Sequence, residues 1–357
     1  MVSVVSSEDL SPKRNRKFWG IMARFLPPLI YEILEIIYNL YGYLKLSKEV
    51  KSFKPDFIYE RYSLYNFSGI LTAKKWKIPL ILEVNSPIAY EKKKYGRLNF
   101  PILANRLEKW IFTNASKTIV VSNVLKKYLI NINVPAEKLE IIPNGINPLD
   151  FKEEDVSTKD TIRKRYGIED KIIIGFVGWI REWHKLDMLL EILENMDVRE
   201  KKLHLLIVGE GPGLDSLKKY IAVHSLSRMV TFSGPIPHNE VKKYISTFDI
   251  ALIVDCTFYC SPMKLFEYMA MGKAIIAPRM ENIEEVLTEG KNCILFKPED
   301  KDDLKKSILT LASDPQLREK IGIEAKHTIY EKEYFWKNNA KKVIRIYNEC
   351  SNKYKEV

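Results

Sequence analysis

Residues Ile172–Leu190 have the sequence IIIGFVGWIREWHKLDMLL. An apolar, β-branched run ends at Gly178, a short charged loop follows, and apolar residues then recur at helical spacing from Leu186. This order predicts a buried strand, a loop and an amphipathic helix. Together they form one strand–helix unit of an α/β fold.

The same order recurs along the chain, which predicts parallel sheets with helices on their faces. Short β-rich runs bounded by Gly, Pro, Asn or Ser are predicted strands at Asp56–Tyr59, Pro79–Val84, Lys117–Val121, Leu139–Ile142, Lys171–Val177, His204–Val208, Met229–Ser233, Ile250–Val254, Ala274–Ala277 and Asn292–Phe296. Helical patterns lie at Leu64–Trp76, Leu103–Ala115, Asn123–Asn131, Leu186–Met196, Leu214–His224, Asn239–Phe248, Leu265–Met271 and Asp302–Ser313.

Composition limits the class of protein. The chain has 357 residues, 46% hydrophobic and 29% charged, which predicts two or three globular domains. Its net charge of +11 favours anionic partners such as nucleotides or lipid headgroups. The four cysteines are too scattered for a disulfide framework. The N-terminus lacks the apolar core of a signal peptide and no apolar run is long enough to span a bilayer, so we expect a cytoplasmic location.

The polar, aperiodic stretch NPLDFKEEDVSTKD predicts a linker. We therefore expect an N-terminal domain over residues 1–150, a linker over 151–170, a C-terminal domain over 171–332, and a helix over 333–357 that packs back toward the N-terminal domain. Two such domains leave a cleft, and ligands of open α/β sheets bind beyond the carboxyl ends of the strands. The loops after the strands are therefore the places to look for chemistry.

One such loop contains Gly209 and Gly211, between an apolar strand and a helix. These glycines either let the backbone approach a ligand or form only a tight strand-to-helix turn. The next strand ends in Ser-Gly-Pro and offers no carboxylate for a ribose, which disfavours a dinucleotide such as NAD.

A second loop carries Arg181, His184 and Lys185 just before a helix. Three cationic or potentially cationic groups beside a helix N-terminus favour a phosphate site. The alternative is a solvated basic loop.

A third loop leads through Pro262 into a short helix with Lys264 and Glu267. Their spacing of three places them on one helical face, where the lysine could meet a phosphate and the carboxylate a ribose diol. The alternative is an ordinary surface ion pair.

The segment SPMKLFEYMAMGKAII, Ser261–Ile276, resembles the nucleotide-sugar signature of glycosyltransferase family 4, whose members have two Rossmann-like domains facing across a cleft (the GT-B architecture). Further segments resemble the family in the same order: PDFIYERYSLYNFSGILTAKKWKIPLILEVNSP, IVVSNVLKKYL, IIPNGIN, GFVGWIREWHKLDMLL, LLIVGEGPGLDSL, VTFSGPIP and YFWKNNAKKVIRIY. The resemblance covers about Lys54 to Tyr347. It implies transfer of a sugar from a nucleotide-sugar donor to a hydroxyl of a glycan or lipid-linked acceptor, with retention of configuration and without a metal ion or other cofactor.

The resemblance also implies roles for particular residues. Catalytic roles fall on Lys264, Arg181 and Asn85, the last where members often carry an acceptor-side His; Glu83 beside it is a second candidate, and a strand-end cap is the plainer interpretation of both. Donor binding falls on Glu267, Lys185, His184, Gly209, Gly211, Ser233, Gly234, Pro235, Ser261, Pro262, Met263 and Leu265. The chain departs from the family pattern at Tyr259, Trp179 and His184, which stand where an acid, an Arg and a Lys are usual.

The family opens with a strand and a glycine-rich loop facing the donor phosphates. Here VSVVSSED resembles a later strand, so the resemblance implies that this first unit is missing and the N-terminal domain incomplete. Two alternatives to a transferase therefore stay open: a degenerate subunit that binds nucleotide-sugar without turnover, and a sugar-nucleotide epimerase of the same architecture. Charge alone would also allow a nucleic-acid binder, but no basic and aromatic module for one is present.

The segment Lys13–Lys54 is basic and aromatic. It predicts either an amphipathic helix that lies on an anionic membrane or a core helix of the N-terminal domain with a solvated polar face. Lys92, Lys93, Lys94 and Arg97 would extend the basic patch or form a solvated loop. Cys256 and Cys260 lack the further ligands of a zinc site and are expected to be buried thiols.

Overall fold

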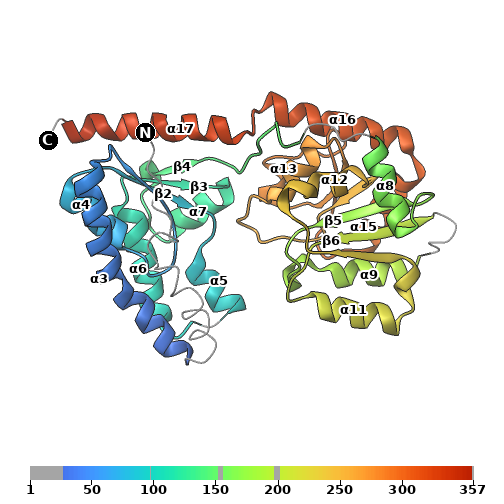
Figure 1. Cartoon of the computed structure of the whole chain (residues 1–357), viewed down its shortest axis with the longest axis horizontal. Helices are drawn as coiled ribbons and strands as arrows, with labels where there is room; N and C mark the ends of the chain where they lie inside the picture. Colours follow the sequence, from blue (N-terminus) through green and yellow to red (C-terminus); the bar gives the residue numbers. More distant parts are fainter. Residues whose placement is uncertain (1–26, 97, 152–155, 197–201, 356–357) are drawn as a thin grey trace. The chain divides into compact units, whose positions relative to one another are not determined.

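The computed structural model describes residues 27–96, 98–151, 156–196 and 202–355 (Figure 1). The chain divides into two compact units. The first comprises the described residues up to Ile142 together with Ala340 onward, and the second comprises Pro143–Asn339.

The described residues of the first unit form a parallel sheet of order β1-β2-β3-β4. Its strands are β1 (Ile58–Arg61), β2 (Leu80–Val84), β3 (Lys117–Val120) and β4 (Leu139–Ile141), and its helices are α3 (Pro28–Phe53), α4 (Ser68–Trp76), α5 (Ile88–Tyr95), α6 (Pro101–Asn114) and α7 (Asn123–Asn131). The last helix, α17 (Trp336–Lys355), returns to this unit, where Ile346 and Cys350 pack against Ile81, Ile119 and Ile142.

The described residues of the second unit form a six-stranded parallel sheet of order β10-β9-β8-β5-β6-β7. Its strands are β5 (Ile172–Val177), β6 (Leu203–Val208), β7 (Val230–Gly234), β8 (Ile250–Leu252), β9 (Ala274–Pro278) and β10 (Ile294–Phe296), and its helices are α8 (Val156–Tyr166), α9 (Leu186–Glu194), α11 (Leu214–Val223), α12 (Val241–Ser246), α13 (Met263–Ala270), α14 (Glu281–Glu284), α15 (Lys301–Ser313) and α16 (Pro315–Glu331).

Both faces of this second sheet are covered. Along β5, Ile174 and Phe176 belong to one buried cluster, which α9, α11 and α15 complete. Ile173 and Val177 belong to another, which α12, α13 and α16 complete. Figure 1 shows α9 on one side of β5 and β6 and α12 and α13 on the other. Burial on both faces explains why these strands are continuous apolar runs.

The strand order places a topological switch point between β5 and β8. These strands are neighbours in the sheet, yet the chain leaves them toward opposite edges. The loops after β5 and β8 therefore diverge and leave a crevice beyond the carboxyl ends of the strands, where ligands of open α/β sheets bind.

The predicted α/β class with two parallel-sheet domains is confirmed, and all ten predicted strands are present within three residues at each end. The predicted linker 151–170 is wrong in part, because α8 lies inside it. The helix has little apolar periodicity and is fixed by Arg163, whose guanidinium donates to Asp249 at 2.8 Å and to the carbonyl of Thr247 at 2.7 Å. The sequence also gave no prediction of a helix at α5, α14 or α16, while α3 and α17 agree with the helical alternatives proposed for those segments.

The stretch VSVVSSED and the basic residues Lys13, Arg14, Arg16, Lys17, Arg24 and Arg97 lie outside the described residues. None of the described helices is both long enough and apolar enough to cross a bilayer.

Candidate functional site

The loops that leave β5 and β8 meet beside the switch point and enclose a cavity of about 190 Å³. Trp183 and His184 line it from the first loop, and Asp255, Cys256 and Cys260 line it from the second. Pro262 and Lys264, at the start of α13, complete the wall. The structure thus brings together the second and third loops that the sequence indicated.

Lys264 has its ammonium group buried in this wall. The Nζ atom lies 3.9 Å from the centre of the Phe176 ring, and it has no hydrogen-bond partner among the residues that the structure describes. Burial lowers the pKa of Lys264 to about 8, and the nearby Cys256, Cys260 and Glu267 offset part of that effect. A desolvated cation without a hydrogen-bond partner is costly, so the position favours an anionic ligand.

Helix α13 adds to the positive potential at this point. Its N-cap residue, Pro262, makes no side-chain cap, and no acidic residue occupies the first turn. The partial positive charge of the helix N-terminus therefore reinforces the charge of Lys264.

His184 is neutral rather than cationic. It lies in the short η2 turn (Glu182–His184) against the Phe176 ring, and burial, with Lys264 and Arg181 nearby, lowers its pKa to about 3. Its Nδ1 accepts a hydrogen bond from the Arg181 amide at 3.4 Å, which leaves the proton on Nε2. The ring is therefore a hydrogen-bond donor without charge.

The other two cations of this loop have neighbours of their own. Lys185 forms ion pairs with Asp255, at 3.3 Å, and with Glu299. Arg181 is exposed, and its guanidinium lies over the Trp179 and Trp183 rings at 6.0 and 5.2 Å. Of the predicted cations, Lys264 is the one whose ammonium is both buried and without a hydrogen bond in the described part of the chain.

Glu267 lies one turn after Lys264 and is 7% exposed. Burial raises the pKa of its carboxyl group, while His238 and Lys264 act in the opposite direction. His238 Nε2 lies 3.9 Å from Glu267 Oε1. The two neighbours in the motif differ in placement, since Met263 is partly exposed and Leu265 is completely buried.

Gly209 and Gly211 are explained by packing between loops. A Cβ atom on Gly209 would lie 2.2 Å from the Gly178 carbonyl oxygen, and one on Gly211 would lie 2.2 Å from the Ile180 carbonyl oxygen. Both residues also have positive φ angles, at 126° and 155°. Absence of side chains here lets the loop after β6 pack directly on the loop after β5.

Ser233, Gly234 and Pro235 lie at the end of β7 beside this glycine loop. The Gly209 amide donates to the Gly234 carbonyl at 3.1 Å, and the Ser233 hydroxyl donates to the same carbonyl at 2.9 Å. The segment is therefore fixed at the same carboxyl end of the sheet as the cavity.

Ser261 is bound to the segment that precedes the second sheet. Its hydroxyl accepts from the Asn144 amide at 3.1 Å, and its carbonyl accepts from Asn144 Nδ2 at 2.6 Å. These contacts position the start of α13, and hence Lys264, from more than a hundred residues away in sequence.

Cys256 and Cys260 are free thiols with restricted access. Asn282 Nδ2 lies within 3.8 Å of both sulfur atoms and donates to the Cys260 carbonyl at 2.8 Å. No group of three or more metal-ligating side chains occurs among the described residues.

Asn85 belongs to the first unit, where it follows β2. Its Nδ2 donates to Glu83 Oε1 at 2.7 Å, and Glu83 Oε2 accepts from the Tyr59 hydroxyl at 2.6 Å. The Oδ1 of Asn85 is buried, with no hydrogen-bond partner in the described part of the chain. The strand end thus presents an ordered amide, carboxylate and phenol.

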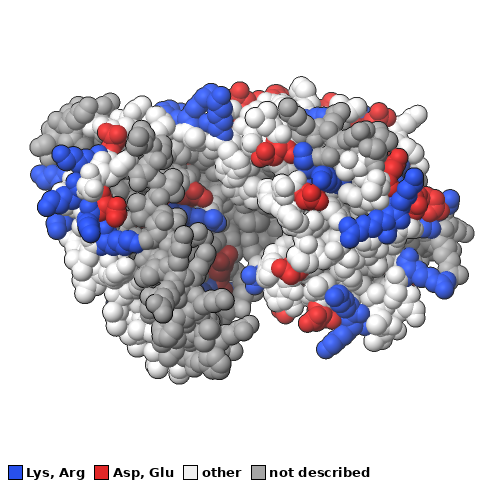
Figure 2. All heavy atoms as spheres, viewed as in Figure 1, with Lys and Arg blue, Asp and Glu red and all other residues white. Residues whose placement is uncertain are grey.

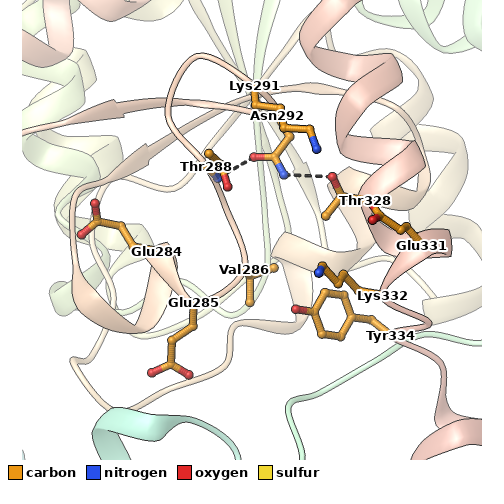
Figure 3. A pocket seen from close by; sticks show the side chains of 10 residues that line it. All are labelled: Glu284, Glu285, Val286, Thr288, Lys291, Asn292, Thr328, Glu331, Lys332 and Tyr334. Carbon is orange, nitrogen blue, oxygen red and sulfur yellow. Dashed lines mark hydrogen bonds between the residues drawn. The ribbon is translucent and has the colours of Figure 1, made fainter.

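A second cavity, of about 220 Å³, lies between α14 and α16 (Figure 3). Its central side chain, Asn292, accepts from the Thr288 amide at 2.7 Å and donates to the Thr328 hydroxyl at 3.0 Å. In Figure 3 the carboxylates of Glu284 and Glu285 point away from Asn292 and from each other. The polar groups are satisfied and do not converge, so this cavity is not a candidate site.

Sequence reasoning missed three residues around the first cavity. His238 and Asp255 lie on loops with no motif of fixed spacing, so nothing in the sequence marked them. Asn144 lies in the quoted segment IIPNGIN, but its contact with Ser261 spans 117 residues.

Two protein-family models match the chain. The model described as Glycosyltransferase Family 4 matches residues 2–148, and the model described as Glycosyl transferases group 1 matches residues 158–328. The second match contains the cavity and both of its loops.

Individual proteins show the same similarity. An uncharacterized glycosyltransferase of Methanocaldococcus jannaschii is 24% identical over 93% of this chain and 83% of its own length. The GPI3 subunit of the phosphatidylinositol N-acetylglucosaminyltransferase of Saccharomyces cerevisiae is 26% identical over 72% of this chain and 56% of its own length.

Among solved structures, Anabaena HepE in complex with UDP superimposes with a TM-score of 0.72 at 18% identity, covering 88% of this chain and 82% of that one. The same Anabaena protein has been crystallised with UDP-glucose. At this identity the likeness shows the fold, which is the two-domain arrangement of α/β glycosyltransferases.

Proposed function

Because the chain belongs to glycosyltransferase family 4, we propose that it transfers a sugar from a nucleotide-sugar donor to a hydroxyl group of a glycan or lipid-linked acceptor, with retention of configuration. The observation that carries the proposal is the buried ammonium of Lys264, which has no hydrogen-bond partner among the described residues.

The donor diphosphate occupies the cavity at the switch point in this proposal. Lys264 and the N-terminus of α13 face its phosphate oxygens, and His184 donates a neutral hydrogen bond through Nε2. When the bond between the sugar and the diphosphate breaks, the bonding electrons move to a phosphate oxygen. Fixed positive groups stabilise the charge that develops there, without reorganisation at the moment of reaction.

Other residues recognise the rest of the donor. Glu267 accepts hydrogen bonds from the two ribose hydroxyls, and the backbone of Ser233–Pro235 lies beside the base. Asn85, in the first unit, contacts the acceptor or the sugar through its buried Oδ1. The presence of UDP in the Anabaena structure supports a nucleoside diphosphate as the ligand class.

Neither a metal ion nor another cofactor takes part in the proposed reaction. Lys264 and the α13 N-terminus supply the positive charge that a divalent cation supplies elsewhere. We therefore expect donor binding and turnover to be unchanged by EDTA. Activity that disappears in EDTA and returns with Mn²⁺ would contradict this part of the proposal.

The test is calorimetry with a panel of UDP, GDP and ADP and their matching nucleosides. One diphosphate should bind more tightly than its nucleoside, and at 100 times its dissociation constant it should stabilise the protein by about 2.7 kcal/mol. Lys264→Gln should remove most of this preference, whereas Lys219→Gln, at an exposed position on α11, should not. Equal affinity for diphosphate and nucleoside in the unmutated chain would overturn the proposal.

Turnover is then measured with the sugar conjugate of the nucleotide that binds. Lys264→Ala should lower the rate by about 10²–10³-fold, the usual effect of losing one preorganised donor. The anomeric configuration of the product, observed by NMR, tests retention. Tight diphosphate binding with no sugar transfer to any acceptor or to water would favour a binding subunit instead.

A further inference from the structure

Helix α3 is inverted relative to an ordinary surface helix. Its polar side chains face the protein: Glu32 and Asn39 are buried, at 2% and 4% exposure. Its apolar side chains Ile30, Ile33, Ile37, Leu40, Tyr41 and Leu44 are 40–67% exposed. Their spacing of three or four residues places these six on one face, which we call the α3 stripe.

Hydrogen bonds fix this orientation of the helix. Glu32 accepts from the Tyr65 hydroxyl at 2.9 Å and from the amides of Asn99 and Phe100 at 2.8 and 3.2 Å. Asn39 donates to the Tyr65 carbonyl at 2.6 Å and accepts from the amides of Phe67 and Ser68. Rotation that buried the stripe would break all of these bonds, so its exposure is built into the unit.

The stripe is larger than the scattered apolar residues of an ordinary surface. From Ile30 to Leu44 it extends about 21 Å along the helix. Contiguous exposed apolar surface of this kind marks a site of interaction with a membrane or another molecule.

The charges around the stripe identify the partner. Lys48 and Lys51 continue the same face of α3, while Glu32, Glu35 and Glu49 lie toward the opposite face by helical spacing. Lys74, Lys75 and Lys77 end α4, which packs beside α3. Figure 2 shows Lys and Arg side chains gathered over the ends of these two helices, at its left edge.

We propose that the α3 stripe and its lysines dock the N-terminal unit on an anionic lipid surface. The helix lies in the plane of the interface with its Ile and Leu side chains among the acyl chains, as the absence of a described spanning helix requires. The lysines meet lipid phosphates, and Tyr41 lies at the boundary between them. This surface is separate from the donor cavity, so its binding can be measured without turnover.

The experiment is co-sedimentation of the full-length protein with vesicles. One set contains phosphatidylcholine alone, and the other contains equal amounts of phosphatidylcholine and phosphatidylglycerol. We expect binding to the anionic set, with weaker binding at high salt and to the neutral set. Absence of binding to the anionic vesicles would overturn the proposal.

Paired variants separate the two components. Ile37→Gln with Leu44→Gln should weaken anionic-vesicle binding at least about tenfold, because two large apolar side chains no longer enter the lipid. Lys48→Gln with Lys51→Gln should weaken it about tenfold to thirtyfold. The matched controls are Ile323→Gln, which is 60% exposed on α16, and Lys219→Gln; both should bind as the unmutated protein does.

Circular dichroism melting confirms that each variant is folded, as expected for exposed positions. Equal binding by the stripe variants and the controls would overturn the docking surface. Sedimentation velocity tests the other occupant. A dimer that the stripe substitutions dissociate, with no effect on vesicle binding, would assign the stripe to a second copy of the chain and overturn the lipid proposal.

Discussion

Lys264 places a charge where the fold alone gains nothing from it. Its pKa falls from the ordinary 10.5 to about 8 because the ammonium is buried. The folded state therefore holds this proton less tightly than the unfolded state does. The free-energy cost of the buried charge is present in full below pH 8 and disappears as the pH rises to about 10.5.

Lys264→Met should therefore stabilise the protein at pH 7. We expect the free energy of unfolding to rise by on the order of 2 kcal/mol, since each unit of pKa shift corresponds to about 1.4 kcal/mol. The gain should shrink between pH 8 and pH 10.5. Urea denaturation at pH 7 and pH 10 measures it, with Lys219→Met as the control. A loss of stability at pH 7 would show that the ammonium has a partner that stabilises the fold.

Glu267→Gln tests the other half of the motif. A carboxylate that accepts two ribose hydroxyls contributes about 1.5–3 kcal/mol for each bond, and the neutral amide keeps the shape while weakening both bonds. Nucleotide affinity should fall about tenfold or more, by calorimetry, with an unchanged melting temperature. Glu284→Gln, in the second cavity, is the matched control. Equal affinity in the two variants would remove Glu267 from the donor site.

At the scale of elements, the loops after β5 and β6 are held together by glycine. Gly209→Ala would place a Cβ atom 2.2 Å from the Gly178 carbonyl oxygen at a φ angle of 126°. We expect a loss of roughly 2–4 kcal/mol in the free energy of unfolding, since both strain and displacement contribute. Gly290→Ala is the control: its φ is 69°, but no atom lies within 4 Å, so only the conformational cost of about 1 kcal/mol remains.

Denaturant titrations of both variants give the difference. Because Gly178 adjoins Lys264, Gly209→Ala should also weaken diphosphate binding, whereas Gly290→Ala should leave it unchanged. Equal destabilisation by the two substitutions would mean that the loops do not pack as closely as the glycines indicate.

Elements differed in how well the sequence predicted them, for a physical reason. The strands of the second sheet are buried on both faces, so each is a continuous apolar run that needs no knowledge of its neighbours. Helix α8 has no such pattern and depends on Arg163, whose partner Asp249 lies 86 residues away. The sequence accordingly suggested a linker in that place.

The candidate site divides along the same line. Residue types and spacing indicated Lys264 and Glu267, since one helical turn determines their relation. The charge state of His184 and the ion pairs of Lys185 with Asp255 and Glu299 depend on chain segments brought together by folding. No local pattern carries that information, so the basic loop suggested three available cations where the structure shows one exposed, one paired and one neutral group.

At the scale of the whole molecule, the chain ends in the unit where it began. Helix α17 starts after the second unit and supplies Ile346 and Cys350 to the core of the first, against Ile81, Ile119 and Ile142. The stability of the N-terminal sheet therefore depends on residues at the far end of the sequence. Donor binding depends on the second unit alone, since its cavity is lined from the loops after β5 and β8.

Ile346→Ala should separate these two dependencies. Ile346 is completely buried, so truncation should cost about 2–5 kcal/mol in the unfolding of the first unit. Ile344→Ala, two residues earlier on the same helix at a position 48% exposed, should cost far less. Hydrogen exchange followed by mass spectrometry should show lost protection in β2, β3 and β4, with β5 and β6 unchanged. Nucleoside diphosphate affinity should be the same in both variants, because the cavity keeps every residue that lines it. If Ile346→Ala instead weakened nucleotide binding while sparing the N-terminal strands, the donor site would have to extend beyond the second unit.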